Sequence, residues 1–210
     1  MDGTIIDTKD CHFSTWETVL NRHGYHLDPD VYITNFGRNT RTILPIFLGF
    51  SPEPELMDRL IAEKAELFRK IAPIESRLIP GVENWLSTAG THGILQAIAS
   101  SGPLENIRTM MSSFSLIDYF DRLVSGDDLP AKPEPDVFLE AARLLNRKPD
   151  ECLVIEDSLP GVKAAKAAGM TCIAISTTMS RAELDLADKV VDDFTQPLLP
   201  VLAELGFIVR

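Results

Sequence analysis

Polar side chains that could act on a phosphoryl group stand at four separate places in the sequence: Asp2, Ser100, Ser101, Lys132, Glu156 and Asp157. Clustered carboxylates repel one another, and a divalent cation together with a lysine would offset that repulsion. Because neither His nor Cys belongs to this set, its oxygen ligands favour Mg²⁺ over Zn²⁺. A lysine, a hydroxyl and a cation around one point also suit a phosphoryl group, whose charge is spread over three oxygens. The set therefore predicts metal-assisted phosphoryl chemistry.

These side chains stand at the ends of predicted strands. Short apolar runs rich in Ile and Val alternate with helical stretches in the second part of the chain, and the runs cover residues 94–99, 122–125, 152–155, 171–176 and 189–191. This alternation predicts right-handed crossovers and a parallel sheet covered on both faces. Ligands of such sheets bind beyond the carboxyl ends of the strands. We therefore expect an α/β fold whose core is a Rossmann-like parallel sheet.

The segment between residues 9 and 75 has a different pattern. Phe13, Trp16 and Leu20 recur at helical spacing, further helical signals cover residues 40–47 and 56–70, and no strand signal is present. The sequence thus predicts a small helical domain over residues 9–75. This domain would be inserted into an α/β core formed by residues 1–8 and 76–210.

The composition restricts the class of protein. Among 210 residues, 20 basic side chains face 31 acidic ones, and the net charge of −11 argues against a nucleic-acid or anionic-membrane partner. No apolar run approaches the roughly 18 residues that span a bilayer, and the first residues do not resemble a secretion signal. The three widely spaced cysteines fit reduced thiols in the cytoplasm. We expect a cytoplasmic enzyme that binds a small molecule.

Four segments resemble the motifs of the haloacid-dehalogenase (HAD) superfamily of phosphohydrolases, in the family's order. The segments are D-G-T-I-I-D-T at 2–8, I-A-S-S at 98–101, K-P-E-P-D at 132–136 and E-D-S-x-x-G at 156–161. The predicted helical domain also stands where this family inserts its helical cap. The resemblance implies a HAD-like core with a cap, and it makes a monomer the default expectation.

The resemblance also implies a role for each matching residue. Asp2 matches the general acid/base, whose backbone carbonyl also contacts Mg²⁺. Ser100 and Lys132 match the groups that bind the phosphoryl oxygens, with Ser101 beside them in the substrate site. Glu156 and Asp157 match the acids that bind the metal, so the implied metal set is Asp2, Glu156 and Asp157.

Residues in the predicted cap resemble the β-phosphoglucomutase-like branch of the superfamily. His12 matches a histidine that supports the acid/base Asp, and Lys64 matches a lysine that faces the active site. Without the resemblance, His12 reads as a hydrogen-bonded bystander and Lys64 as a surface charge. Arg38 and Arg41 lie on either side of the position expected for the arginine that grips a second phosphate.

The sequence departs from the family pattern at its start. The Asp that attacks phosphorus should stand two residues before Asp2, and the central strand that carries it is missing. We expect either that this chain is a truncated form of a longer one or that it is a protein that binds phosphorylated ligands without turnover. As printed, the chain should not form an aspartyl phosphate.

A second departure from the family pattern bears on the choice between a phosphatase and a mutase. The mutases carry a Ser-Lys-Asn run after the second-motif serine, whereas Gly102-Pro103-Leu104 stands here. A mutase needs two phosphate grips and a phosphatase needs one. The sequence therefore favours a Mg²⁺-dependent phosphatase of small phosphorylated metabolites, such as sugar phosphates. A sugar phosphomutase of the β-phosphoglucomutase type and a catalytically dead binding protein are the alternatives.

Overall fold

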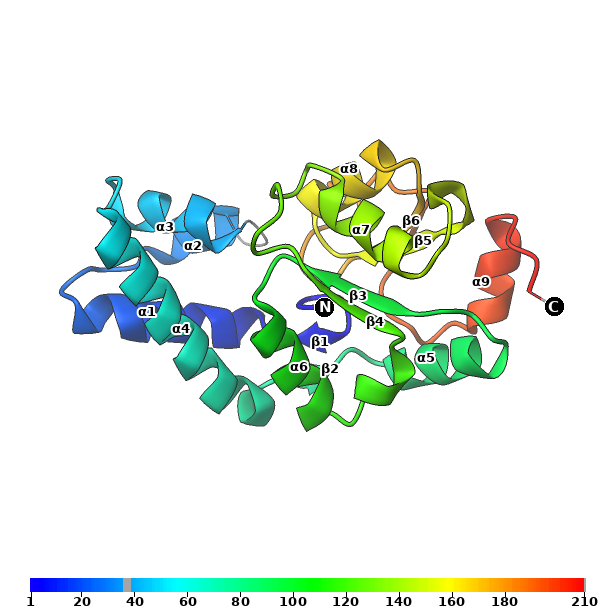
Figure 1. Cartoon of the computed structure of the whole chain (residues 1–210), viewed down its shortest axis with the longest axis horizontal. Coiled ribbons are helices and arrows are strands. Elements are labelled where there is room, and N and C mark those ends of the chain that lie inside the picture. Colours follow the sequence, from blue (N-terminus) through cyan, green and yellow to red (C-terminus); the bar gives the residue numbers. More distant parts are fainter. Residues whose placement is uncertain (36–38, 210) are drawn as a thin grey trace.

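The computed structural model of the protein describes residues 1–35 and 39–209. In Figure 1 a helical lobe lies at one end of the molecule and a larger α/β lobe at the other. None of the described helices is both long and apolar enough to span a membrane.

The helical lobe contains the first four helices of the chain: α1 (Lys9–Arg22), α2 (Pro29–Asn35), α3 (Thr40–Leu48) and α4 (Pro54–Glu75). One face of each helix is buried in a shared apolar cluster that includes Trp16, Leu20, Leu44 and Leu60. The helices predicted at residues 40–47 and 56–70 are confirmed as α3 and α4, whereas α2 was not predicted. The proposed cap boundaries at 9 and 75 coincide with the start of α1 and the end of α4.

The α/β lobe contains five parallel strands: β3 (Ala97–Ser100), β4 (Arg122–Ser125), β5 (Leu153–Glu156), β6 (Thr171–Ile175) and β7 (Lys189–Val191). Five α-helices accompany them: α5 (Val82–Thr91), α6 (Leu104–Ser113), α7 (Asp136–Leu144), α8 (Leu159–Ala167) and α9 (Leu198–Glu204). Two short 3₁₀ turns, η1 (Ile117–Tyr119) and η2 (Pro149–Glu151), precede β4 and β5. The predicted α/β class with parallel strands is confirmed.

Two apolar clusters cover the strands. One contains buried residues of α5, α6 and α9, such as Trp85, Ile107 and Val201, and the other contains residues of α7 and α8, such as Phe138 and Val162. Figure 1 places α7 and α8 on one side of the strands and α5 and α6 on the other. The strands are thus covered on both faces, as the apolar runs predicted.

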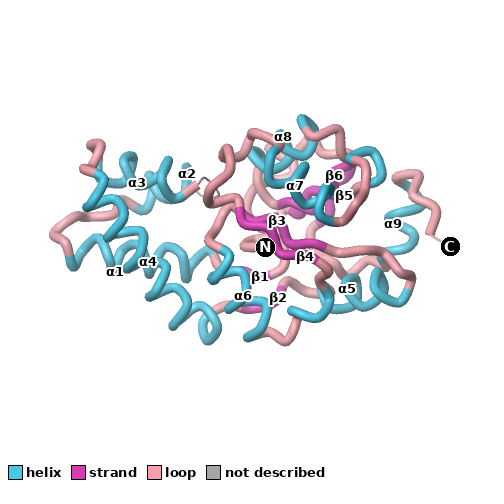
Figure 2. The backbone as a smooth tube through the Cα atoms, viewed as in Figure 1, coloured by secondary structure: helices cyan, strands magenta, loops and turns pink. Residues whose placement is uncertain are grey.

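The sheet is interrupted in the middle. β3 pairs with β4, and β5 pairs with β6 and β6 with β7, but among the described residues no ladder joins β3 to β5. Figure 2 shows the two groups of strands as separate pieces. One edge of β3 and one edge of β5 are therefore left without a partner strand, and unpaired backbone groups there carry a cost unless water satisfies them.

A short antiparallel pair connects the two lobes. β1 (Ile6–Asp7) pairs with β2 (Arg77–Leu78), and these strands stand directly before α1 and directly after α4. The chain therefore leaves the α/β lobe and returns to it at the same place.

Candidate active site

A cavity of about 130 Å³ lies at the carboxyl ends of β3 and β5, facing the helical lobe. Eight of the ten predicted site residues line this cavity: Asp2, His12, Lys64, Ser100, Ser101, Lys132, Glu156 and Asp157. They come from the amino-terminal turn, α1, α4 and the segments after β3, β4 and β5. Residues that are far apart in the sequence thus meet at the carboxyl ends of the parallel strands, where ligands of such sheets bind.

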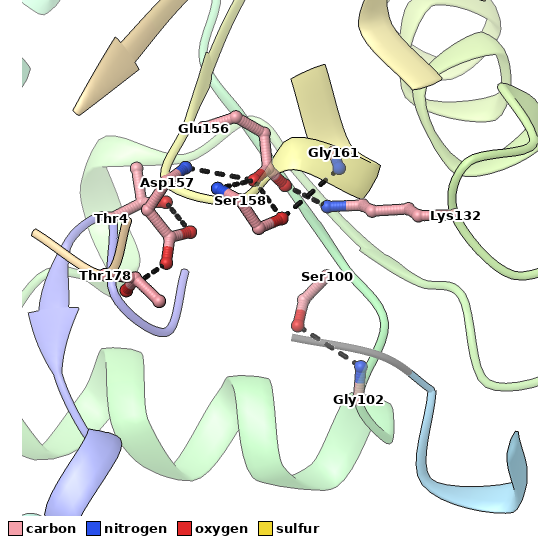
Figure 3. Close-up of polar contacts among 9 residues, drawn as sticks. All are labelled: Thr4, Ser100, Gly102, Lys132, Glu156, Asp157, Ser158, Gly161 and Thr178. Atoms are coloured by element: carbon pink, nitrogen blue, oxygen red, sulfur yellow. Dashed lines mark hydrogen bonds and ion pairs between the residues drawn. The ribbon is translucent and has the colours of Figure 1, made fainter. Parts of the chain in front are cut away.

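Glu156 is the most fully bonded group of the cavity (Figure 3). Its Oε1 forms a buried ion pair with Lys132, and its Oε2 accepts from the backbone nitrogen of Asp157 at 3.0 Å and from the Ser158 hydroxyl at 2.9 Å. Burial has the largest single effect and would raise the pKa of the Glu156 carboxyl, but the charge and hydrogen bond of Lys132, the charge of the amino terminus and the hydrogen bond from Ser158 together lower that pKa. The Glu156 carboxyl is therefore held in its ionised form.

The turn that holds Glu156 requires glycine at position 161. The Ser158 hydroxyl accepts from the backbone nitrogen of Gly161 at 3.2 Å and so caps the start of α8. A Cβ at residue 161 would lie 2.0 Å from Cδ of Glu156. The motif glycine is thus the residue that lets α8 approach the carboxylate.

Replacing Gly161 with Ala should therefore disturb the site. We expect Gly161→Ala to displace Glu156 and to lower the free energy of unfolding by about 2–3 kcal/mol, because the added methyl group overlaps a buried ion pair. Gly90→Ala in α5 is the matched control, since its nearest neighbour lies at 3.9 Å and alanine should stabilise the helix by up to about 1 kcal/mol. Urea unfolding of both variants measures this difference. Equal effects would contradict the steric argument.

Asp157 has no cation among its direct partners. Its two oxygens accept from the hydroxyls of Thr4 at 3.0 Å and Thr178 at 2.5 Å (Figure 3). Burial, with the nearby charge of Glu156, raises the pKa of the Asp157 carboxyl to about 6. Among the described residues Glu156 is paired with Lys132, whereas Asp157 is held by hydroxyls and by the more distant charge of the amino terminus. A cation bound beside Asp157 would balance its charge.

Asp2 belongs to a chain of contacts that reaches into the helical lobe. Lys64 Nζ lies 2.6 Å from His12 Nδ1, and His12 Nε2 lies 3.3 Å from Asp2 Oδ1. Because an ammonium can only donate, Nδ1 accepts and the proton of a neutral imidazole is on Nε2, which faces Asp2. Burial and the charge of Lys64 lower the pKa of His12, in agreement with a neutral ring.

Two hydrogen bonds hold the Asp2 carboxylate. The Thr8 hydroxyl donates to Oδ1 at 2.8 Å, beside the contact from His12. Burial has the largest single effect and would raise the pKa of Asp2, but the interactions with His12, the charge of the amino terminus and the hydrogen bond from Thr8 together hold that pKa well below its usual range. Both contacts are made to Oδ1, which leaves Oδ2 for exchange with a ligand.

The two predicted cap arginines are not part of the described cavity. Arg41 forms an ion pair with Asp58 at 2.8 Å, and both side chains are more than half exposed. Its partner Asp58 lies on the neighbouring helix α4. Burial raises the pKa of Asp127, which lines an adjoining cavity, and the charge of Arg41 partly offsets that rise. Arg38 lies outside the described residues.

Several residues of the site were not singled out from the sequence. Trp16, Tyr32 and Thr40 line the cavity from the helical lobe, and Thr178 holds Asp157. Thr178 follows the end of β6, so the strand-end rule could have found it. For the residues from the helical lobe no sequence signal distinguishes a cavity wall from ordinary core.

The described residues offer a limited set of metal ligands. Within residues 1–35 and 39–209, no group of three or more His, Cys, Asp and Glu side chains is arranged to hold a metal ion. The Asp2 side chain is turned to His12 and Thr8, so the acidic oxygens near one another are those of Glu156 and Asp157. Mg²⁺ sites often use one or two carboxylates and keep several waters, so this donor set fits Mg²⁺.

The α/β fold, the helical lobe and the strand-end residues define a haloacid dehalogenase-like hydrolase, and the chain belongs to that family. Residues 1–175 match the family described as "Haloacid dehalogenase-like hydrolase". The family predicted from the four sequence segments is therefore confirmed.

Several similar proteins have names that refer to phosphates of sugars or hexitols. Hexitol phosphatase B of Escherichia coli (strain K12) is 36% identical over 209 residues, covering 93% of this chain and 90% of that protein. The beta-phosphoglucomutase of Bacillus subtilis (strain 168) is 29% identical over 209 residues, covering 95% and 91%. Among solved structures, CbbY (mutant D10N) from Rhodobacter sphaeroides in complex with xylulose-(1,5)bisphosphate has a TM-score of 0.85 at 27% identity, covering 93% of this chain and 92% of that one.

Proposed function

We propose that the protein is a Mg²⁺-dependent phosphatase of small phosphorylated metabolites of the sugar phosphate class. The observation that carries this proposal is the shared cavity, which Lys132, Ser100 and Asp2 line together at the carboxyl ends of the strands. The phosphatases and the mutase among the relatives support the same substrate class.

Lys132 and Ser100 bind the phosphoryl group in this proposal. Lys132 supplies positive charge at the end of a buried ion pair, and the buried Ser100 hydroxyl lies at the end of β3, where it accepts from the backbone nitrogen of Gly102 at 3.2 Å. A hydroxyl that accepts this bond still has its own proton to donate to a phosphoryl oxygen. The charge of Lys132 and the hydroxyl of Ser100 are thus held in place before a ligand binds, and such preorganised groups stabilise a phosphoryl group electrostatically.

Asp2 moves the proton. Its low pKa keeps Asp2 ionised, and the ionised carboxylate is the form that can accept a proton from attacking water. In the first step it gives a proton to the leaving oxygen, and the negative phosphoryl group beside it raises its pKa for that purpose. His12 and Lys64 orient Asp2 from the helical lobe through the contact chain described above.

A magnesium ion would be held by Asp157, by Glu156 and by the backbone carbonyl of Asp2. When bound, it supplies positive charge to the phosphoryl oxygens and balances the buried carboxylates. Asp157 fits this role best, because its pKa is raised and its direct partners are neutral hydroxyls.

The attacking carboxylate has no candidate among the described cavity residues. Asp2 is bonded to His12 and Thr8, Glu156 to Lys132, and Asp157 to two threonines. We propose that an Asp on a strand between β3 and β5 supplies it, because these are the two edges without a partner. Its oxygen would attack phosphorus while the bond to the leaving oxygen breaks, and water would then release phosphate and restore the carboxylate.

One experiment tests this reaction. The chain is extended at its amino end by an apolar β-strand that ends in Phe-Asp, so that the new Asp stands two residues before Asp2. We expect this protein to release phosphate from sorbitol 6-phosphate in MgCl₂, and EDTA to stop the release. The same extension with Asn in place of Asp is the control and should be at least about 100-fold slower, because it cannot form the covalent intermediate. No phosphate release by the Asp form would refute the proposal.

The second candidate is a protein that binds phosphorylated ligands without turnover. Each carboxylate of the described cavity already has a hydrogen-bond or ion-pair partner within the protein, and this favours binding without turnover. A mutase grips two phosphates, and it is disfavoured because the two lysines of the described cavity are already engaged, Lys132 with Glu156 and Lys64 with His12, and Arg41 does not line the cavity. Conversion of one sugar phosphate isomer into another, without phosphate release, would favour the mutase.

A further inference from the structure

A second cavity of about 50 Å³ adjoins the first, between α4 of the helical lobe and α6 of the α/β lobe. The two cavities share six lining residues: Met1, Asp2, His12, Thr40, Lys64 and Gly102. The part that only the second cavity has is lined by the apolar side chains of Ile61, Ala65, Phe68, Pro103 and Ile107 and by two polar residues, Asn106 and Asp127. If the phosphoryl group of a substrate lies at Lys132, the rest of that substrate can extend past Asp2 into this second cavity.

Asn106 offers a hydrogen-bond donor that the described residues do not use. Its side chain is 6% exposed, and its Oδ1 accepts from Arg69 Nη1 at 2.9 Å. A guanidinium can only donate, so the atom toward Arg69 must be the oxygen, and the amide nitrogen points elsewhere. No described residue accepts from that nitrogen, and it is not among the fully buried polar atoms without a partner, so a molecule in the cavity can reach it. The nitrogen is thus set to bond to something that enters the cavity.

Asp127 offers the complementary acceptor. It follows β4, its backbone nitrogen donates to the Ser125 hydroxyl at 3.2 Å, and its carboxylate accepts no hydrogen bond from the described residues. A hydroxyl group both donates and accepts, so a donor and an acceptor on one cavity suit a hydroxyl-bearing carbon chain. A carboxylate also repels a second phosphate.

We infer that the second cavity is the binding subsite for the leaving group of the substrate, and that Asn106 and Asp127 recognise its hydroxyls. The inference rests on the proposed function, because it assumes that the phosphoryl group lies between Lys132 and Asp2. The ligand class is a monophosphate ester of a polyol or open-chain sugar, with C–H surfaces against the apolar wall and hydroxyls toward the two polar residues.

Ligand binding to the full 210-residue chain tests the subsite, and it requires no turnover. Calorimetric titrations in MgCl₂ use three probes: inorganic phosphate, n-propyl phosphate and sorbitol 6-phosphate. We expect the unaltered chain to bind sorbitol 6-phosphate about tenfold more tightly than propyl phosphate. Asn106→Leu should remove about 3- to 10-fold of that preference, as expected for one lost hydrogen bond. Asn84→Leu, at an exposed position of α5, is the matched control and should keep the preference.

Two further variants keep the test decisive. Asn106→Asp retains the acceptor for Arg69 but removes the donor, so it should also lose the preference even if the leucine variant folds poorly. Asp127→Asn should lose part of the preference and should bind sorbitol 1,6-bisphosphate more tightly than the unaltered chain does. Absence of binding by inorganic phosphate would overturn the proposed function and the subsite with it. Phosphate binding with no change of preference in any Asn106 variant would overturn the subsite alone.

Discussion

Replacing Lys132 with Met is expected to remove phosphate binding and to lower the free energy of unfolding by about 3–5 kcal/mol. The Lys132 and Glu156 side chains are only 9% and 7% exposed. Without Lys132, the Glu156 carboxylate stays buried beside Asp157 with no cation in contact. Loss of one partner of a buried pair is strongly destabilising for this reason, and phosphate loses the lysine that lines the cavity from the α/β lobe.

The surface pair of Lys166 and Asp188 is the matched control. These side chains are 40% and 34% exposed, so Lys166→Met should cost no more than about 1 kcal/mol. Urea unfolding at pH 7 compares the two variants, and titration with inorganic phosphate follows binding. A cost at Lys132 no larger than that at Lys166 would contradict the argument from burial.

The pH dependence of the Lys132→Met effect gives a second test. In the unaltered chain the pKa of Glu156 is lowered, so its contribution to stability is present above the unfolded pKa and is lost as the pH falls. In the variant, burial acts without Lys132 and raises that pKa, so the carboxyl takes up a proton more readily. The difference in stability between the two proteins should therefore be smaller at pH 4 than at pH 7.

The site residues of the α/β lobe could be predicted from the sequence because parallel strands place their carboxyl ends together. Ser100, Glu156 and Asp157 each follow or end an apolar run, so the chemistry at these positions did not depend on knowing the strand order. The helical lobe was different. Arg41 was singled out by its spacing in the sequence alone. Its ion pair with Asp58 depends on how α3 packs on α4, and sequence spacing carries no information about that packing.

The fold elements that sequence reasoning missed have weak local signals. Helix α5 contains Gly90 and two threonines, which are poor helix formers, and α9 has Pro200 within its few residues. The interruption between β3 and β5 depends on long-range pairing, which no local pattern reports.

Replacing Lys64 with Met should raise the free energy of unfolding at pH 7, whereas Lys132→Met lowers it, and the size of the gain should depend on pH. Lys64 lies buried against Phe68 and Trp16, with its ammonium 4.5 Å and 5.7 Å from the two ring centroids. Burial lowers the pKa of Lys64 from 10.5 to about 8. At 1.36 kcal/mol per pKa unit, the buried ammonium costs about 3 kcal/mol at pH 7.

The sign of the pH effect follows from proton linkage. Below pH 8 both the folded and the unfolded chain hold the Lys64 proton, and the folded state bears the full cost. Between pH 8 and 10.5 the unfolded chain holds more protons than the folded chain, so Lys64 makes stability rise with pH across this window. The methionine variant lacks this contribution.

The loss of the contact to His12 reduces the gain from removing the charge. His12 Nδ1 would lose its donor, at a cost of about 1–2 kcal/mol, so Lys64→Met should be more stable than the unaltered chain by about 1–2 kcal/mol at pH 7. By pH 10.5, where the folded lysine is neutral, the cost of the charge has nearly disappeared and only the lost contact is left, so the variant should be less stable than the unaltered chain by about 1–2 kcal/mol. Urea unfolding at pH 7, 9 and 10.5 measures the difference. Lys70→Met, at an exposed pair with Glu66 on the same helix, is the control and should show no such trend. A gain at Lys64 that stays constant with pH would show that its ammonium carries no cost of burial, and the contact chain to Asp2 would then need another protonation state.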